Sequence, residues 1–249
     1  MRWFHRPPPG RPSGDPTGRP RFAALQAAAP AERAAALAGA ARDGWIEAAA
    51  AYGLVEAQLL FGQILLDRNQ AELALCWFRA AAGAGHAPAV NMVGRCLELG
   101  WGTPADPAAA AVQYRRAAEQ GLDWAQFNLG MLLLYGLGLE RDRGQAAQWF
   151  GRAAAQRHAK AANMLGRCHE EGWTGPRDLA LASRWYAAAA AWGDYRGQYN
   201  LGTLLLQRDR PAALLLFAQA LAGGSADFRA EAAAALSASG DPELARLAA

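Results

Sequence analysis

The strongest candidates for a catalytic site in this chain are Arg167, His169 and Glu170. An imidazole beside a carboxylate can act as a general acid or base, and a guanidinium can hold an anionic substrate. Catalysis of this kind needs a nucleophile or a second histidine at a useful spacing, and the sequence offers neither. We therefore interpret His169 as a structural, hydrogen-bonded residue. The alternative is an enzyme or small-ligand-binding protein centred on His169, Glu170 and Arg167.

The three cysteines predict neither a disulfide nor a metal site. Cys96 and Cys168 occupy equivalent positions in two similar segments, 72 residues apart. Helices that pack about 8 to 10 Å apart would separate these thiols by about 20 Å, which is beyond disulfide or shared-metal reach. The chain also lacks His-Glu-x-x-His, Gly-x-Ser-x-Gly, Cys-x-x-Cys and phosphate-loop motifs. The sequence therefore predicts no catalytic residues, no metal and no cofactor, in a protein that is not an enzyme.

Composition and charge exclude a further class of function. The 249 residues are 53% hydrophobic and 19% charged, which is enough apolar surface to build a core. The formal net charge is +3, but five arginines against one aspartate place the excess within residues 1–21. A nucleic-acid-binding protein needs a basic stripe on its folded surface, and the rest of this chain is close to neutral. We therefore expect no nucleic-acid partner.

The first 21 residues differ in composition from everything that follows. They contain six prolines in an arginine-rich sequence with almost no apolar surface. Proline removes backbone donors and disfavours helix, so we predict that residues 1–21 form a disordered tail. No apolar run follows the first residues as it does in a secretory signal, and no later stretch reaches the about 18 to 20 apolar residues of a membrane span. We expect a cytoplasmic protein without a membrane span.

The rest of the chain is built from a repeated unit. Glycines recur within similar apolar stretches at spacings of 32, 36, 36 and 36 residues, at Gly62, Gly94, Gly130, Gly166 and Gly202. Apolar residues recur at three- and four-residue spacing in two runs per unit, which predicts two helices per unit. A glycine inside a helix costs about 1 kcal/mol relative to alanine. Close contact with a neighbouring helix is the compensation that we expect.

The second predicted helix of each unit carries a ring between two alanines, as Phe150 lies between Ala146 and Ala153. Small residues one turn above and below a ring let a neighbouring helix approach while the ring fills the gap. Paired helices bury both faces only by stacking on their neighbours, which predicts an all-α, right-handed superhelical solenoid of about five helix-turn-helix repeats with helical caps. The predicted parts are the tail (1–21), an N-terminal cap (22–53), the repeats (54–86, 87–122, 123–158, 159–194 and 195–223) and a C-terminal cap (224–249).

The repeated unit resembles the Sel1-like repeat, a relative of the tetratricopeptide repeat. That pattern runs roughly Ala-x-x-Asn-Leu-Gly, then Gly-x-Gly, then Ala-x-x-Trp-aromatic-x-x-Ala-Ala, and the third unit matches it best at residues 125–130, 136–138 and 146–154. The resemblance covers about residues 54–223, although the first and fifth units lack the Gly-x-Gly loop and look more like tetratricopeptide units. It implies a bacterial-type scaffold or adaptor that binds a protein or peptide through the concave groove of an α-solenoid.

The predicted groove follows the first helices of successive units, on the face away from the repeat glycine. Amides there can pair with a peptide backbone, guanidinium groups with carboxylates, and rings supply apolar area. The candidate groove residues are Asn91, Arg95, Trp124, Phe127, Met131, Tyr135, Asn163, Arg167, Tyr199 and Thr203. Lys160 and Arg196 extend the same rows, and we interpret them as solvated surface charges. The alternative for the aromatic positions is a solvated helix face whose rings shield one another.

Trp101 and Trp173 lie in equivalent predicted loops and are candidate partner-binding residues, because loop tryptophans can be exposed anchors. The alternative is that each ring folds back over its own helix pair. A different possibility is that the arginine-rich tail contacts an acidic partner while the repeats serve as a platform. The sequence names neither the partner nor the oligomeric state, and a monomer is the working expectation.

Overall fold

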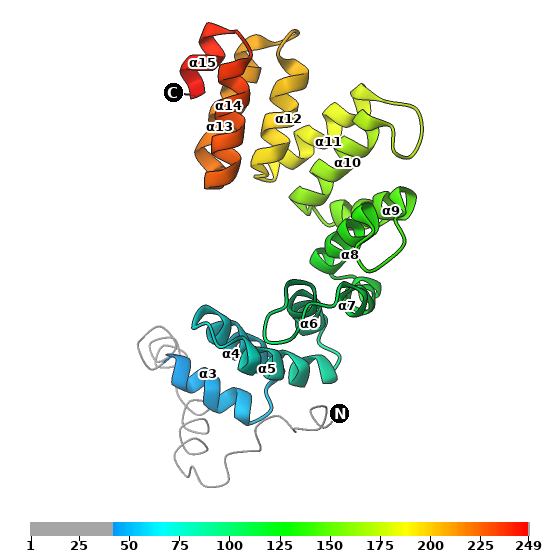
Figure 1. Ribbon diagram of the computed structural model, residues 1–249, viewed down its shortest axis with the longest axis vertical. Coiled ribbons are helices and arrows are strands. Elements are labelled where there is room, and N and C mark those ends of the chain that lie inside the picture. The colour runs from blue at the N-terminus through cyan, green and yellow to red at the C-terminus, as the bar shows by residue number, and fades with distance from the viewer. Residues whose placement is uncertain (1–41, 249) are drawn as a thin grey trace. The chain divides into compact units, whose positions relative to one another are not determined.

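The computed structural model describes residues 42–248, and the described chain consists of helices joined by turns and loops (Figure 1). It divides into two units, which within the described residues are 42–122 and 123–248. Both units are built from helical hairpins, which confirms the all-helical repeat fold expected from the glycine spacing. The predicted tail and residues 22–41 of the predicted N-terminal cap lie outside the described residues.

The first unit holds one helix followed by two hairpins. α4 packs on α5, α6 packs on α7, and α5 also contacts α6, so that consecutive helices are neighbours. The helices are α3 (Arg42–Ala51), α4 (Val55–Asp67), α5 (Ala71–Gly83), α6 (Ala87–Leu99) and α7 (Pro107–Glu119).

The second unit holds three hairpins and two closing helices. Consecutive helices again contact one another, and α10 additionally contacts α12, the first helix of the next hairpin. The helices are α8 (Asp123–Tyr135), α9 (Arg143–Ala155), α10 (Ala159–Glu171), α11 (Leu179–Ala191), α12 (Tyr195–Leu205), α13 (Arg210–Gly223), α14 (Ala226–Ala238) and α15 (Pro242–Ala248).

Aspartates define where four of the second helices begin. In each case the side chain accepts a hydrogen bond from the backbone N–H three residues on, which satisfies a donor that the helix leaves unpaired. These aspartates are Asp106, Asp142, Asp178 and Asp209. The preceding helices α6 and α10 end at Gly100 and Gly172, whose φ angles of +73° and +70° are left-handed and favour glycine. Local sequence thus sets both ends of the connecting loops.

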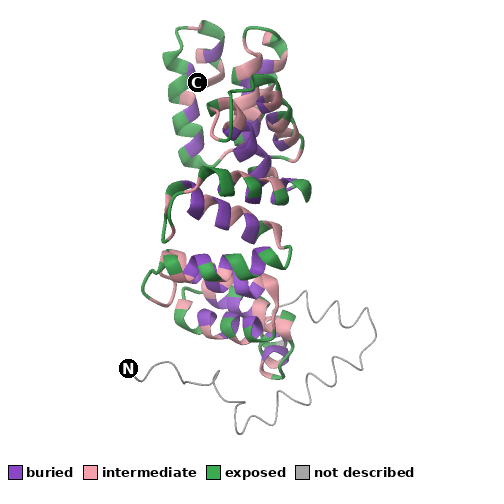
Figure 2. Cartoon of the chain, turned by 90° about the vertical axis from the view of Figure 1, so that its right-hand side faces the viewer, coloured by how far each residue is buried: buried purple, intermediate pink, exposed green. Residues whose placement is uncertain are grey.

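A buried ring seated on the repeat glycine forms the centre of every hairpin. The pairs are Phe78 on Gly62, Tyr114 on Gly94, Phe150 on Gly130, Tyr186 on Gly166 and Phe217 on Gly202. A Cβ atom added at any of these glycines would lie closer than 3.0 Å to a ring carbon. The rings are at most 1% exposed, and within each unit Figure 2 shows buried residues where helices face one another. This close contact between helices confirms the compensation that we expected for a glycine inside a helix.

Two of the five rings are tyrosines, and their hydroxyl groups have dedicated partners. Tyr114 donates a hydrogen bond to Glu98 at 2.5 Å, and Tyr186 donates to Glu170 at 2.5 Å. Burial, and then this hydrogen bond, raises the pKa of both tyrosines, so the hydroxyl groups stay protonated. Where the ring is a phenylalanine, the position of the glutamate holds leucine instead, at Leu66, Leu134 and Leu206. The ring and its partner therefore change together along the chain.

Candidate functional site

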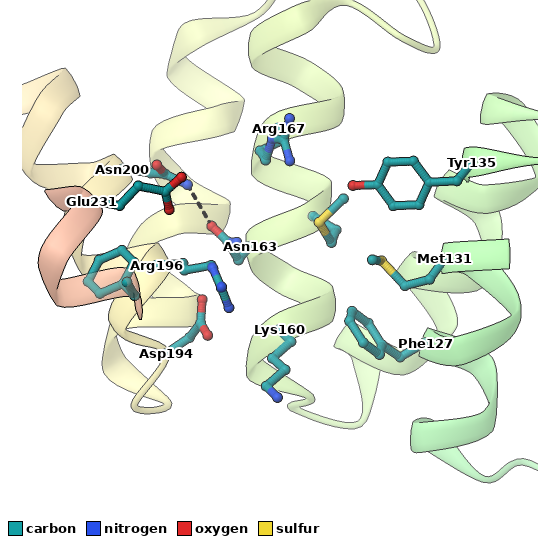
Figure 3. A pocket seen from close by; sticks show the side chains of 12 residues that line it. Phe127, Met131, Tyr135, Lys160, Asn163, Arg167, Asp194, Arg196, Asn200 and Glu231 are labelled. Carbon is teal, nitrogen blue, oxygen red and sulfur yellow. Dashed lines mark hydrogen bonds between the residues drawn. The ribbon is translucent and has the colours of Figure 1, made fainter. Parts of the chain in front are cut away.

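A pocket of about 460 Å³ lies in the second unit among α8, α10, α12 and α14. Three of these are first helices of successive hairpins, and α14 closes the row at its C-terminal end. The lining residues are Phe127, Met131, Tyr135, Lys160, Asn163, Met164, Arg167, Asp194, Arg196, Asn200, Phe228 and Glu231 (Figure 3).

Helical spacing explains how α10 forms the middle of the pocket. Lys160, Asn163, Met164 and Arg167 follow one another at i, i+3, i+4 and i+7, which is a single face of a helix. Two turns separate Lys160 from Arg167, a distance of about 10 Å along the helix axis. Figure 3 shows these two cations at opposite ends of the pocket with Asn163 between them.

α8 supplies the apolar wall. Phe127, Met131 and Tyr135 are four residues apart and lie on one face, and Figure 3 shows them on the side of the pocket that faces α10. The ring of Phe127 is stacked on His158 with 4.9 Å between centroids, and lies 5.9 Å from the ring of Phe150. These contacts fix the orientation of Phe127 before any ligand arrives.

A pair of amides lies at the floor of the pocket. Asn200 Nδ2 donates a hydrogen bond to Asn163 Oδ1 at 2.9 Å, and Asn163 is only 4% exposed. This bond uses one donor and one acceptor, which leaves Asn163 Nδ2 as a donor and Asn200 Oδ1 as an acceptor. A donor and an acceptor side by side match the C=O and N–H of a peptide group.

Two cations reach the pocket without an ion pair among the described residues. The Lys160 ammonium lies 5.3 Å from the ring centroid of Trp124. The Arg196 guanidinium lies 5.1 Å from the ring centroid of Tyr195 and donates a hydrogen bond to its hydroxyl group at 3.0 Å. Both side chains are exposed. Reasoning from the sequence treated these two charges as solvated, because only the folded chain brings them to one pocket.

The third cation of the pocket belongs to a local network. Arg167 forms an ion pair of 2.9 Å with Glu171, and its guanidinium lies 5.4 Å from the ring centroid of Trp173. Trp173 Nε1 also donates to Glu171 at 2.7 Å. From the preceding hairpin, Arg143 lies 5.2 Å from the same ring centroid. Trp173 is therefore half-buried between two arginines.

Asp194 is a structural acid at the edge of the pocket. It is 5% exposed and accepts a hydrogen bond from the Gly197 N–H at 2.9 Å, which caps α12. Burial raises the pKa of its carboxyl group, against the opposing effects of that hydrogen bond, Arg196 and Lys160. Its hydrogen-bonding role lies within the fold, at the beginning of α12.

Most candidate groove residues of the second unit line the pocket or lie beside it. Phe127, Met131, Tyr135, Asn163 and Arg167 line the pocket. Trp124, which is 48% exposed, lies beside it with its ring centroid 4.6 Å from that of His158.

Tyr199 and Thr203 lie outside the pocket lining. The ring of Tyr199 packs 5.2 Å from Phe217 and 5.8 Å from Phe228, and the exposed Thr203 hydroxyl donates to the Tyr199 carbonyl. Phe228 of α14 packs against Tyr195 and Tyr199 of α12 and so occupies the pocket side of the Tyr199 ring. Reasoning from the sequence missed Phe228 and Glu231, because it gave no signal that α14 returns to this face.

The candidate residues of the first unit lie on and beside α6. Asn91 is 7% exposed. The Arg95 guanidinium lies 4.9 Å from the ring centroid of Trp101, which is half-buried in the loop after α6. Asn91 and Arg95 are the counterparts of Asn163 and Arg167 in α10, so the two units carry the same two residue types on equivalent helical faces.

Two residues of the alternative catalytic site, Glu170 and Arg167, have separate partners. Glu170 accepts the hydrogen bond from Tyr186, Arg167 pairs with Glu171, and neither His169 nor Glu170 lines the pocket. Within residues 42–248, no group of three or more His, Cys, Asp or Glu side chains is placed to hold a metal ion. No helix of the described chain is long and apolar enough to cross a membrane.

Comparisons with known proteins agree with this architecture. The family model described as Sel1 repeat matches residues 46–86, 87–122, 125–158, 159–194 and 196–225. A Sel1 repeat protein from Oxalobacter formigenes has a similar crystal structure, with a TM-score of 0.69 and 26% identity over 79% of this chain and 86% of that one. The immunity protein Pa5087 from Pseudomonas aeruginosa shares the fold, with a TM-score of 0.55 and 16% identity over 78% of this chain and 75% of that one. No curated protein matches the chain significantly.

Proposed function

The chain belongs to the Sel1 repeat family, and on that premise we propose that it is an interaction scaffold that binds an extended segment of a partner protein in the pocket of the second unit. Repeats of this fold commonly serve as protein-interaction scaffolds. The observation that carries the proposal is the hydrogen-bonded pair Asn163 and Asn200, which presents a donor and an acceptor opposite an apolar wall.

An extended peptide fits this arrangement in two ways. Its backbone offers a carbonyl acceptor and an N–H donor in each peptide group, and these complement Asn163 Nδ2 and Asn200 Oδ1. Its side chains project alternately to the two sides, so that one can face the wall formed by Phe127 and Met131. The contacts that hold Phe127 in place reduce the entropy that binding must remove.

The buried cysteines do not provide a nucleophile for catalysis. Nucleophilic catalysis requires an activated side chain within hydrogen-bond reach of a base. Burial raises the pKa of the Cys168 thiol to about 11, and that of Cys96 in the first unit to about 11, so both thiols stay protonated and inert. We therefore propose that the protein is not an enzyme.

Peptide display on the immobilised full-length protein tests the proposal. Peptides enriched from a random library are labelled with fluorescein and titrated by anisotropy with wild type, Asn163→Ala and Asn91→Ala, each shown by circular dichroism to be folded. Loss of the amide pair should weaken binding by roughly tenfold. Asn91→Ala, the matched change in the first unit, should leave affinity unchanged. Failure to enrich any peptide, or equal affinity for both variants, contradicts the proposal.

A further inference from the structure

We infer that the partner segment is acidic, an extended peptide whose apolar side chain packs on the α8 wall and whose two carboxylates, four residues apart on the same side of the chain, pair with the cations at the two ends of α10. This inference rests on the proposed function, because it names the chemistry of the segment bound in the same pocket.

The charges that a ligand meets in this pocket are mainly positive. Lys160 and Arg196 are exposed and Arg167 is half-buried, so all three are accessible to a ligand. Of the two acids in the lining, Asp194 is 5% exposed and caps α12, while Glu231 is exposed on α14. Arg167 is paired with Glu171, so the pocket presents two cations without an ion pair, Lys160 and Arg196, against one accessible carboxylate, which favours an anionic ligand over a cationic one.

The cations also retain unused hydrogen-bonding capacity. Arg167 uses Nη2 for its ion pair with Glu171, and its guanidinium has further N–H donors. Within the described chain, Lys160 contacts the ring of Trp124, and Arg196 contacts Tyr195 and, at 5.9 Å, the ring of Phe228. Such cation–π contacts are weak at exposed sites, and they leave several N–H donors free. A carboxylate would accept charge-assisted hydrogen bonds from these donors, which are stronger than neutral ones.

The spacing of the cations sets the spacing of the carboxylates. Lys160 and Arg167 are separated by two helical turns, or about 10 Å, and an extended chain advances about 3.3 Å per residue. Side chains on the same side of an extended chain are an even number of positions apart, and two acidic residues four positions apart are separated by about 13 Å. The long, flexible side chains of Lys160 and Arg167 cover the difference of about 3 Å, so both carboxylates reach the ends of the pocket while the residue midway between them faces Met131 and the Asn163–Asn200 pair. Figure 3 shows this order of groups, from Lys160 past Asn163 to Arg167.

The cation Lys160, at one end of the pocket, occurs in the second unit and has no counterpart in the first. Lys160 is the only lysine among the 249 residues. The equivalent position in α6 of the first unit holds Pro88, although Asn91 and Arg95 repeat the amide and the guanidinium. The face of α6 therefore has a cation at one end, whereas α10 has a cation at both.

The test uses the display-selected peptides, since random selection imposes no charge. We expect enrichment of Asp and Glu around an apolar residue. Replacing both acidic residues by Gln or Asn should weaken binding to the full-length protein at least about tenfold, and raising NaCl from 50 to 300 mM should weaken binding of the acidic form only. Lys160→Ala should lose about half of the difference in binding free energy between the acidic and amide peptides, because one of the two carboxylates loses its cation, and Arg95→Ala, which removes a cation from the equivalent face of α6, should preserve the difference.

The outcomes separate the inference from the function on which it rests. Neutral or basic peptides that bind wild type and lose affinity with Asn163→Ala overturn the acidic ligand and leave the scaffold proposal standing. Acidic peptides whose affinity is the same for wild type and Lys160→Ala also overturn the inference. If no peptide depends on Asn163, the proposed function fails, and the acidic ligand fails with it.

Discussion

The hairpin α6–α7 of the first unit and the hairpin α10–α11 of the second share their interiors and differ at their surfaces. Both seat a tyrosine on the repeat glycine and satisfy its hydroxyl group with a glutamate of the first helix. Both bury a cysteine at the same position, Cys96 and Cys168. Only the second hairpin has a lysine at the start of its first helix, where the first has Pro88. Shared residues therefore build the hairpin, and the differing ones distinguish the surface on which we propose that the second unit binds its partner.

A histidine precedes both α6 and α10, and the two differ in their contacts. His158 Nδ1 accepts a hydrogen bond from the Ala161 N–H at 3.2 Å and so caps α10, and its ring is stacked on Phe127. His86, at the equivalent position before α6, makes no side-chain cap. The second unit thus fixes the beginning of α10 and the pocket wall with one imidazole.

The largest effect tests the interior that the two hairpins share. Tyr114→Ala and Tyr186→Ala each remove a ring with 0% exposure from its contact with glycine. Each should lower the free energy of unfolding by about 3 to 5 kcal/mol, measured by urea denaturation with tryptophan fluorescence. A loss below about 1 kcal/mol in one hairpin alone would show that the two interiors are not equivalent.

A smaller effect tests the coupling between the ring and its partner. Tyr186→Phe leaves Glu170 without its hydroxyl donor and should cost about 1 to 3 kcal/mol of unfolding free energy. The double change Tyr186→Phe with Glu170→Leu recreates the pair found at Phe150 and Leu134, and should recover much of that loss. The same denaturation experiment with Tyr114→Phe and Glu98→Leu provides the matched comparison. A double variant less stable than both single variants would contradict the coupling.

The smallest effect concerns His158 and pH. Burial lowers the pKa of His158 below the ordinary value of 6.5, while Asp123 raises it and Lys160 lowers it. The unfolded chain therefore binds the proton first, and the share of stability that comes from neutral His158 is lost as the pH falls below about 6.5. One proton limits the slope to about 1.4 kcal/mol per pH unit.

His158→Asn isolates this titration, because asparagine keeps a cap acceptor and does not titrate. Denaturation between pH 5 and 8 should show a shallower loss of stability at low pH in this variant than in wild type. Identical pH profiles would show that His158 does not contribute to the pH dependence of stability, and would remove one of the differences between the two hairpins.

The sequence predicted the interior better than the site. Glycine spacing and the ring between two alanines are local, periodic signals, and they correctly predicted the helical hairpins and the contact at Gly130. The pocket depends on contacts between distant segments. Phe228 reaches the pocket from α14 and packs against Tyr199. The exposed side chains of Lys160 and Arg196 come to line one pocket only after the hairpins stack. The joint change of tyrosine with glutamate and phenylalanine with leucine was visible in the repeats and could have predicted the buried hydrogen bonds.

Methionine methyl NMR can locate the bound peptide on the protein. The chain has four methionines: Met131 and Met164 line the pocket, whereas Met92 lies on α6 in the first unit. The full-length protein, labelled with ¹³C at the methionine methyl groups, is titrated with a display-selected peptide. We predict that the Met131 and Met164 signals shift together to saturation while the Met92 signal stays in place. A shift at Met92 without one at Met131 and Met164, or binding that moves none of the three, would contradict a peptide site in the second unit.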